Sequence, residues 1–134
     1  MSAQNLQVRK ETMTKRVLIV DDSATIRQQV RMALVQAGFD VVEAADGEEG
    51  VAKIRSDLSL SAVICDVNMP KKNGLELIEE IKAGGVNSGI PIVMLTTEGQ
   101  PALVLRAKAA GAKGWIVKPF MPNLLVAAMV KLTT

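Results

Sequence analysis

The chain has 134 residues, 49% of them apolar, a length and composition that suit the core of one globular domain. Its 16 basic and 14 acidic side chains are interspersed and give a formal net charge of +2, which argues against a nucleic-acid-binding surface. The sequence contains no histidine, so histidine triads, histidine-ligated zinc and imidazole catalysis are excluded, and any chemistry must depend on carboxylates, hydroxyls and lysines.

The chain opens with the polar segment MSAQNLQVRKETMTK, which lacks the apolar core of a secretory signal. No apolar run approaches the ~20 residues of a membrane span, so we expect a cytoplasmic protein without membrane insertion. Met13 stands just before the first apolar run, so the residues before it could be a disordered leader, a cloning remnant or a misassigned start. We expect residues 1–14 to be a disordered leader and residues 15–134 to form one domain.

Short apolar runs alternate with segments of helical spacing. Residues 16–20 (RVLIV) are typical of a strand buried on both faces. Apolar residues then recur at helical spacing from Ser23 to Ala37, with Ser23 suited to cap the start and Gly38 to end the helix. The pattern predicts four further strands, each followed by a helix: strands at 41–44, 62–65, 92–95 and 115–117, with the last helix at 123–132 behind Pro122.

This alternation predicts an α/β fold with a five-stranded parallel sheet. Right-handed crossovers place helices on both faces of such a sheet. We expect the doubly wound, flavodoxin-like strand order 2-1-3-4-5, in which strands one and three are neighbours. Ligands bind these sheets beyond the carboxyl ends of the strands, where the winding direction reverses, so functional side chains are to be sought there. Cys65, the only cysteine, lies in the third apolar run and is expected to be a small core residue.

Polar residues follow four of the predicted strands. Asp21 and Asp22 follow the first strand, Asp66 the third, Thr96 the fourth and Lys118 the fifth. Three carboxylates on one rim would repel one another and raise their own pKa values unless a cation held them, and oxygen ligands favour a hard ion such as Mg²⁺. Taken singly, each residue could be a helix cap, a turn residue or a solvated lysine, but their joint placement favours a site.

These residue types suit the transfer of a phosphoryl group. An aspartate attacks phosphorus only if the approaching negative charges are neutralised. In this interpretation Asp66 is the nucleophile and Mg²⁺ bridges a phosphoryl oxygen to the acidic pair. Lys118 pairs with a second oxygen, and the Thr96 hydroxyl donates to a third.

The same motifs resemble those of the response-regulator receiver family, over about residues 15 to 132. The matching motifs are Asp21-Asp22-Ser23, Asp66-Val67-Asn68-Met69-Pro70 with Gly74 behind it, Thr96, and Lys118-Pro119-Phe120. The resemblance implies that Asp66 is the phosphoacceptor and that Thr96 and Lys118 contact the phosphoryl group. It also implies four metal ligands: Asp21, Asp22, Asp66 and the Asn68 backbone carbonyl. It also implies a cis peptide between Lys118 and Pro119.

Receivers of this family couple the phosphoryl group to a distant face through a moving hydroxyl and an aromatic side chain. Thr96 and Trp115 match these switch positions, although tyrosine or phenylalanine is more usual at the second. Asn68 and Glu98 flank the site as in members that lose the phosphoryl group rapidly, which implies a short-lived signal. The resemblance thus describes a signalling switch that catalyses its own phosphorylation and dephosphorylation, rather than an enzyme with a separate substrate.

The last predicted helix points to a partner surface. Residues 124–130 (LLVAAMV) include no polar position, although a helix on a sheet should have a solvated face. We expect this surface, including Leu125 and Val126, to dock a partner together with Trp115 and the helix after strand four. The alternative is an apolar surface without a partner. Three lysines could select an acidic partner: Lys108, Lys113 and Lys131.

The chain ends soon after this helix, so we expect signalling by contact rather than through an attached output domain. The resemblance is greatest to chemotaxis regulators, which carry phosphoryl groups from a histidine kinase to a flagellar motor switch. We expect a monomer that could associate on phosphorylation. The alternatives are a phosphorelay shuttle to a histidine phosphotransfer protein, a flavodoxin-type carrier, and a haloacid-dehalogenase-type phosphatase. The chain lacks tyrosine to sandwich a flavin, and Ser23 replaces the second aspartate of the phosphatase motif.

Overall fold

The computed structural model describes residues 15–134, so the expected leader at residues 1–14 lies outside the described residues. In the described part, five strands alternate with five helices. The strands are β1 (Arg16–Val20), β2 (Asp40–Ala44), β3 (Leu60–Cys65), β4 (Ile92–Thr96) and β5 (Gly114–Val117). The helices are α2 (Ala24–Gln36), α3 (Gly47–Ser56), α4 (Gly74–Lys82), α5 (Pro101–Ala110) and α6 (Pro122–Thr133).

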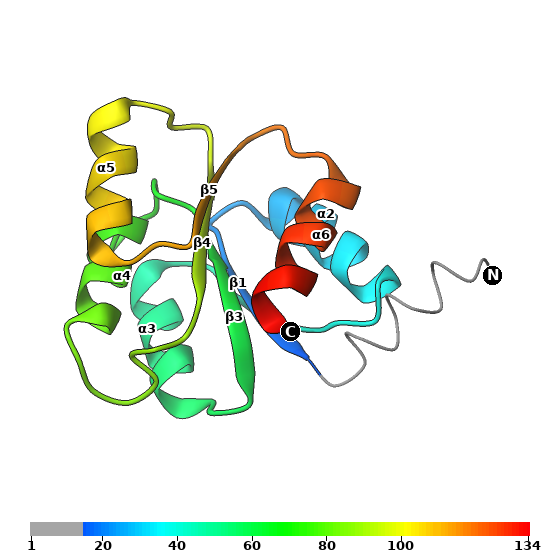
Figure 1. Ribbon diagram of the computed structural model, residues 1–134, viewed down its shortest axis with the longest axis horizontal. Helices are drawn as coiled ribbons and strands as arrows, with labels where there is room; N and C mark the ends of the chain where they lie inside the picture. Colours follow the sequence, from blue (N-terminus) through cyan, green and yellow to red (C-terminus); the bar gives the residue numbers. More distant parts are fainter. Residues whose placement is uncertain (1–14) are drawn as a thin grey trace.

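The five strands form one parallel sheet in the order β2-β1-β3-β4-β5, which confirms the predicted doubly wound topology. Helices α2 and α6 cover one face of this sheet, and α3, α4 and α5 cover the other (Figure 1). Such a three-layer arrangement follows from right-handed crossovers between parallel strands.

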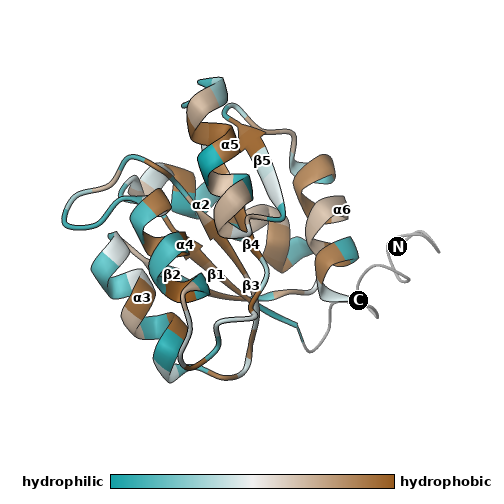
Figure 2. Ribbon diagram, turned by 60° about the vertical axis from the view of Figure 1, so that its left-hand side comes forward, coloured by the Kyte–Doolittle hydropathy of each residue, from teal (hydrophilic) through white to brown (hydrophobic). Residues whose placement is uncertain are grey.

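The central strands supply a core to both faces because successive side chains of a strand point to opposite sides. In β1, Leu18 and Val20 pack with the α3, α4 and α5 side, whereas Val17 and Ile19 pack with the α2 and α6 side. The same alternation continues through β3 and β4. The brown strands between the helices in Figure 2 show this continuous apolar layer. Cys65 belongs to it and is fully buried, as predicted.

Element boundaries differ slightly from the predicted ones. Strands β2 and β3 begin earlier than expected, because Asp40 and Leu60 both pair with Arg16 of β1. The predicted cap of α2 is confirmed, since the Ser23 hydroxyl accepts a hydrogen bond from the Ile26 amide at 3.2 Å. Gly38 has a φ of 96° just after this helix, in the left-handed region that favours glycine.

The apolar helix α6 is only partly a surface helix. Leu125 is 1% exposed and packs in the core on the α2 side, so its expected place on the docking surface was wrong. Val126 is half-buried against the same cluster, and Leu124 is 60% exposed. Position within the helical turn decides the difference, because side chains four residues apart, Leu125 and Met129, share the face toward the sheet. None of the helices in residues 15–134 has the length and apolar character that would let it cross a membrane.

Candidate functional site

The register of the sheet gathers the predicted site residues at one rim. Val20 pairs with Cys65, so the next residues of the two strands, Asp21 and Asp66, leave the sheet side by side. The Asp66 amide continues this pairing by donating to the Val20 carbonyl at 2.9 Å. On the other side, the Lys118 amide donates to the Thr96 carbonyl at 2.9 Å, which ties the ends of β4 and β5 together. The four strand ends therefore meet as the sequence predicted.

The three aspartates form a compact group of oxygen ligands. Asp21, Asp22 and Asp66 each offer one carboxylate oxygen, and these oxygens all lie within 4.8 Å of one another. Asp21 and Asp66 are 2% and 7% exposed, whereas Asp22 is exposed to solvent. An all-oxygen donor set with one solvent-facing side fits a hard divalent cation, which keeps part of its water shell when it binds to carboxylates.

Lys118 lies between two of these carboxylates. Its Nζ is 2.8 Å from Asp21 Oδ2 and 3.2 Å from Asp66 Oδ2. Burial alone would lower the pKa of Lys118, but hydrogen bonds to Asp21 and Asp66 and their charges outweigh it, and the pKa rises. Burial raises the pKa of Asp21, and the Asp66 charge adds to this, although Lys118 and the Ser23 amide partly offset the rise. Lys118 is therefore held as a cation inside the rim.

Asp66 is fixed by its neighbours in the chain. Its Oδ1 accepts a hydrogen bond from the Val67 amide at 2.7 Å, and its carbonyl accepts one from the Cys65 thiol at 3.2 Å. Burial raises the pKa of that thiol, so Cys65 stays protonated. Gly74, the first residue of α4, lies so close that a Cβ there would be 2.0 Å from the Asp66 carbonyl oxygen. Asp66 thus sits on a tightly packed support with one carboxylate oxygen facing Lys118.

Glu98 connects three other predicted residues. Its side chain accepts a hydrogen bond from Asn68 Nδ2 at 2.7 Å, and its amide donates to Thr96 Oγ1 at 3.2 Å. Its carbonyl accepts a bond from Trp115 Nε1 at 2.9 Å. Thr96 is fully buried at the end of β4, and Trp115 is half-buried in β5. Glu98, itself one of the two predicted tuning residues, therefore links the other one, Asn68, to both predicted switch residues.

The peptide bond between Lys118 and Pro119 is cis, as the resemblance implied. Among the contacts that the sequence did not predict are two made by the aspartates. The Val67 amide binds the Asp66 carboxylate, and the Arg27 guanidinium donates to the Asp21 main-chain carbonyl at 2.7 Å. The position of Arg27 one helical turn after the Ser23 cap places it beside the acidic loop, but this spacing alone does not distinguish it from a solvated arginine.

A family model described as the response regulator receiver domain matches residues 17–130, and so includes the three aspartates, Thr96 and Lys118. The chain belongs to the response regulator receiver family. This receiver is 41% identical over 111 residues to a chemotaxis protein CheY1 of Helicobacter pylori, which covers 82% of this chain and 90% of the relative. A chemotaxis protein CheY of Thermotoga maritima is 40% identical over 122 residues, covering 90% of this chain and 99% of the relative.

Solved structures give the same result for the fold of the receiver. The chemotaxis response regulator CheY4 of Vibrio cholerae has a TM-score of 0.81 and 41% identity, covering 89% of this chain and 98% of that chain. A complex from Borrelia burgdorferi, described as CheX-CheY-BeF3-Mg+2, has a TM-score of 0.83 and 30% identity, and the match covers 90% of both chains. Membership in the receiver family favours the receiver interpretation over the flavodoxin-type and phosphatase alternatives.

Proposed function

We propose that this receiver is a phosphorylation switch in which Asp66 accepts a phosphoryl group from a histidine kinase. The observation that carries the proposal is the contact of the Lys118 ammonium with two buried carboxylates, with Asp22 beside them. A fixed cation next to a carboxylate lowers the electrostatic barrier to attack on a phosphoryl group, because the incoming negative charge is partly neutralised in advance.

In the proposed reaction an Asp66 carboxylate oxygen attacks phosphorus as the bond from phosphorus to the kinase histidine nitrogen breaks. The Lys118 ammonium pairs with one phosphoryl oxygen, and the Thr96 hydroxyl donates to another. Water later attacks the phosphorus of the acyl phosphate, which releases inorganic phosphate and restores the Asp66 carboxylate. The receiver thus catalyses its own phosphorylation and dephosphorylation.

We propose Mg²⁺ as the cofactor. The proposed ligands are the carboxylates of Asp21, Asp22 and Asp66 and the main-chain carbonyl of Asn68. The ion supplies positive charge that stabilises the charge developing on the phosphoryl oxygens. The Borrelia CheY complex, whose description includes BeF3 and Mg²⁺, supports the assignment by similarity.

Thr96 and Trp115 are the proposed switch. Thr96 Oγ1 accepts a hydrogen bond from the Glu98 amide, and Trp115 Nε1 donates to the Glu98 carbonyl. Movement of the Thr96 hydroxyl toward a phosphoryl group would change the first of these bonds and so the position of the loop that Trp115 holds. Phosphorylation would then shift the population between two loop arrangements.

The proposed output surface consists of the exposed side chains of α5, β5 and α6. Its apolar members are Leu105, Val117 and Leu124, which are 65%, 51% and 60% exposed. The lysines around them are also exposed, which favours a partner with acidic side chains: Lys108, Lys113 and Lys131. Because the curated relatives named above are chemotaxis proteins, we propose a flagellar motor switch protein as this partner and the cytoplasm as the location.

Fluorine NMR with beryllofluoride, a mimic of the phosphoryl group, tests the reaction. We expect a bound signal from the wild-type chain with Mg²⁺, and none without Mg²⁺ or in Asp66→Asn. Asp40→Asn is a matched control, because Asp40 lies at the start of β2 with a side chain that is 67% exposed. A bound signal that persists in Asp66→Asn contradicts the role of Asp66. Complete absence of binding means a degenerate site and a phosphorylation-independent adaptor.

The output surface has its own test. Leu124→Glu should abolish binding of the beryllofluoride-treated receiver to a motor switch protein in a pull-down with purified components. Leu58→Glu makes the same change at a side chain that is 73% exposed after α3, outside the proposed surface, and should bind normally. Equal binding by both variants contradicts the assigned surface. Phosphoryl transfer from the receiver to a histidine phosphotransfer protein, with no binding to the motor switch, would instead favour the shuttle.

A further inference from the structure

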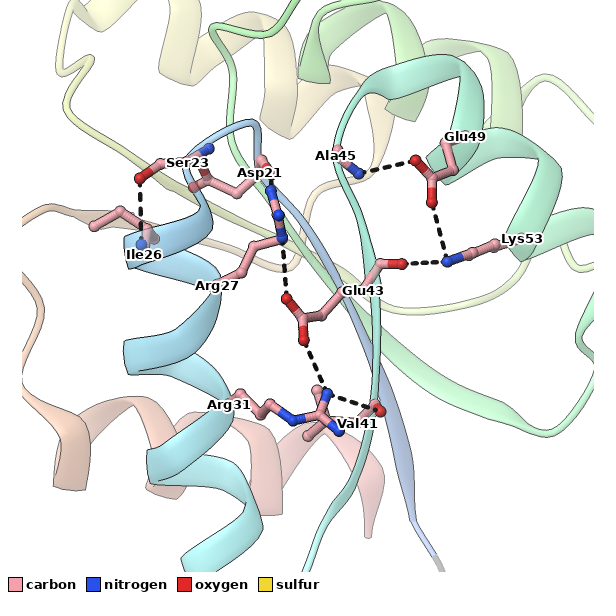
Figure 3. A network of polar contacts seen from close by, with 10 residues as sticks. All are labelled: Asp21, Ser23, Ile26, Arg27, Arg31, Val41, Glu43, Ala45, Glu49 and Lys53. Carbon is pink, nitrogen blue, oxygen red and sulfur yellow. Dashed lines mark hydrogen bonds and ion pairs between the residues drawn. The ribbon is translucent and has the colours of Figure 1, made fainter.

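Arg27 contacts the loop that carries the acidic pair, Asp21 and Asp22. Arg27, in the first turn of α2, points back across the end of the sheet toward β2 (Figure 3). One of its guanidinium nitrogens, Nη1, donates to the Asp21 main-chain carbonyl at 2.7 Å. The Arg27 side chain is only 18% exposed, so the contact is sheltered from water. A charge-assisted bond in such a place is stronger than one between exposed neutral groups.

Asp21 is therefore held at four points. Its amide donates to the Ala44 carbonyl at 3.1 Å, and its carbonyl accepts the Arg27 bond. Its carboxylate accepts from the Ser23 amide at 2.9 Å and from Lys118 at 2.8 Å. Two of these partners are flexible charged side chains that need support of their own: Lys118, which also contacts Asp66 at 3.2 Å, and Arg27.

Glu43 provides the support for Arg27. Arg27 Nε donates to Glu43 Oε1 at 3.0 Å, and the pairing of Glu43 with Ile19 fixes it in β2. The Glu43 carbonyl in turn accepts a hydrogen bond from Lys53, whose Nζ also lies 3.1 Å from Glu49. The Glu43 carboxylate, which also pairs with Arg31, offsets part of the Arg27 charge. An unpaired guanidinium this close to the acidic pair would repel a metal cation, whereas a paired one holds the carbonyl with less repulsion.

We infer that Arg27 and Glu43 are positioning residues for the proposed metal site: Arg27 fixes the main chain of Asp21, and Glu43 orients Arg27 and offsets part of its charge. The inference rests on the proposed function, because it concerns the binding of Mg²⁺ by the acidic group. Residues that hold a metal ligand in place without touching the metal reduce the order that the ligand must gain when the metal binds. Their loss commonly weakens metal binding 10-fold or more.

Arg31 offers a matched control in the same network. It lies one turn further along α2, and its Nη1 donates to the other Glu43 oxygen, Oε2, at 2.9 Å. Its second contact is with the Val41 carbonyl at 3.5 Å, on β2 (Figure 3). Removing the Arg31 charge therefore disturbs the same carboxylate from the same helix and leaves the bond to Asp21 in place.

The test measures Mg²⁺ affinity directly. The Ser23 amide, which binds the Asp21 carboxylate, is the reporter in ¹H–¹⁵N NMR titrations with magnesium chloride. We expect Arg27→Gln to raise the Mg²⁺ dissociation constant about 10-fold. Arg27→Lys, which can keep one bond but not both, should recover part of the loss. Arg31→Gln should bind Mg²⁺ as wild type does. Thermal unfolding without Mg²⁺ provides a readout of stability that is independent of metal binding.

Glu43→Gln keeps the inference testable if Arg27→Gln does not fold. This variant retains the shape of the side chain and exposes the Arg27 charge, so we expect it to weaken Mg²⁺ binding more than Arg31→Gln does. Wild-type affinity in Arg27→Gln, or in Glu43→Gln where that variant is needed, overturns the inference. Equal weakening by the Arg27 variant and Arg31→Gln also overturns it. If wild type itself shows no Mg²⁺ binding that depends on Asp21, the proposed metal site fails, which is a different result.

Discussion

Helices α4 and α5 lie next to each other on one face of the sheet, yet they are attached to it very differently (Figure 1). At the start of α4, Asn73 and Glu76 cap each other reciprocally, with hydrogen bonds of 2.8 and 3.0 Å. Five of its nine residues are buried. At the start of α5, Gln100 makes no side-chain capping bond, and of the ten residues that the structure describes in this helix only Ala107 is buried.

The difference indicates which side of the site is support and which side can move. Helix α4 begins against the main chain of the proposed nucleophile, so a shift of α4 would displace Asp66 itself. Helix α5 follows the loop of Glu98, which is held through hydrogen bonds from Trp115 and Asn68. Elements with few buried contacts open at low free-energy cost. We therefore expect phosphorylation to displace α5 and leave α4 in place.

The largest expected effect comes from adding a methyl group at one end of each helix, and it should fall on the α4 side. In Gly74→Ala the new Cβ meets the Asp66 carbonyl oxygen at 2.0 Å, and we expect the free energy of unfolding to fall by about 3 kcal/mol or more. In Gly111→Ala, at the end of α5, the new Cβ meets only the flexible Lys82 side chain at 3.5 Å. The free energy of unfolding should therefore fall by only about 1–2 kcal/mol, mainly because of the positive φ at this position. Urea unfolding of both variants checks the order, and a reversed order would refute the comparison.

Truncation of an apolar side chain on each helix should give the next largest difference. Ile78 of α4 is fully buried, so Ile78→Ala should destabilise the fold by about 2–5 kcal/mol. Leu105 of α5 is 65% exposed, and Leu105→Ala should change stability by less than about 0.5 kcal/mol. Urea unfolding followed by circular dichroism measures both. A substantial loss in Leu105→Ala would mean that α5 is packed more firmly than its exposure indicates.

Trp115→Phe should loosen α5 selectively. The variant loses the indole bond to the Glu98 carbonyl, worth about 1 kcal/mol. Amide hydrogen exchange should accordingly become about 5-fold faster in α5 and stay unchanged in α4. Val117→Ala, on the same strand at a side chain that is 51% exposed, is the control and should leave exchange in both helices unchanged. Equal acceleration in the two helices would show that Trp115 acts on the whole fold.

The smallest effect should come from the ion pair that links the two helices. Arg106 binds both oxygens of Glu79, at 2.7 and 3.0 Å, and its hydrogen bond lowers the pKa of Glu79. A lowered carboxyl pKa contributes stability above the ordinary carboxyl range, and this contribution disappears as the pH falls below about 4. The difference in melting temperature between wild type and Arg106→Gln should therefore be small near neutrality and vanish in acid. A difference that grows in acid would contradict this role.

The sequence was sufficient to predict the strand order and the rim, because both follow from local patterns. Apolar runs separated by helical segments indicate a parallel sheet, and the residues after each run must then share one edge. Asp21, Asp66, Thr96 and Lys118 meet there for that reason. The roles assigned to these residues in phosphoryl transfer and metal binding stay predictions, to be decided by the beryllofluoride and Mg²⁺ experiments.

Contacts that depend on side-chain direction could not be predicted in the same way. In the run of apolar residues along α6, the sequence offered no polar marker to distinguish buried Leu125 from exposed Leu124. The bond from Trp115 to the Glu98 carbonyl was equally hidden, because it joins β5 to a loop 17 positions earlier in the chain. The sequence alone could not distinguish Arg27 from any other polar helix residue, because its contact with Glu43 depends on the position of β2.

The contact of Lys118 with Asp21 and Asp66 also determines the charge balance of the rim. Three carboxylates against one ammonium leave two negative charges, which one divalent ion would cancel. Replacing a carboxylate by an acyl phosphate adds up to one further negative charge, because a phosphoryl group carries roughly −1.5 to −2 near neutrality. With that ion bound, phosphorylation would therefore add about one negative charge to a rim whose formal charges otherwise balance.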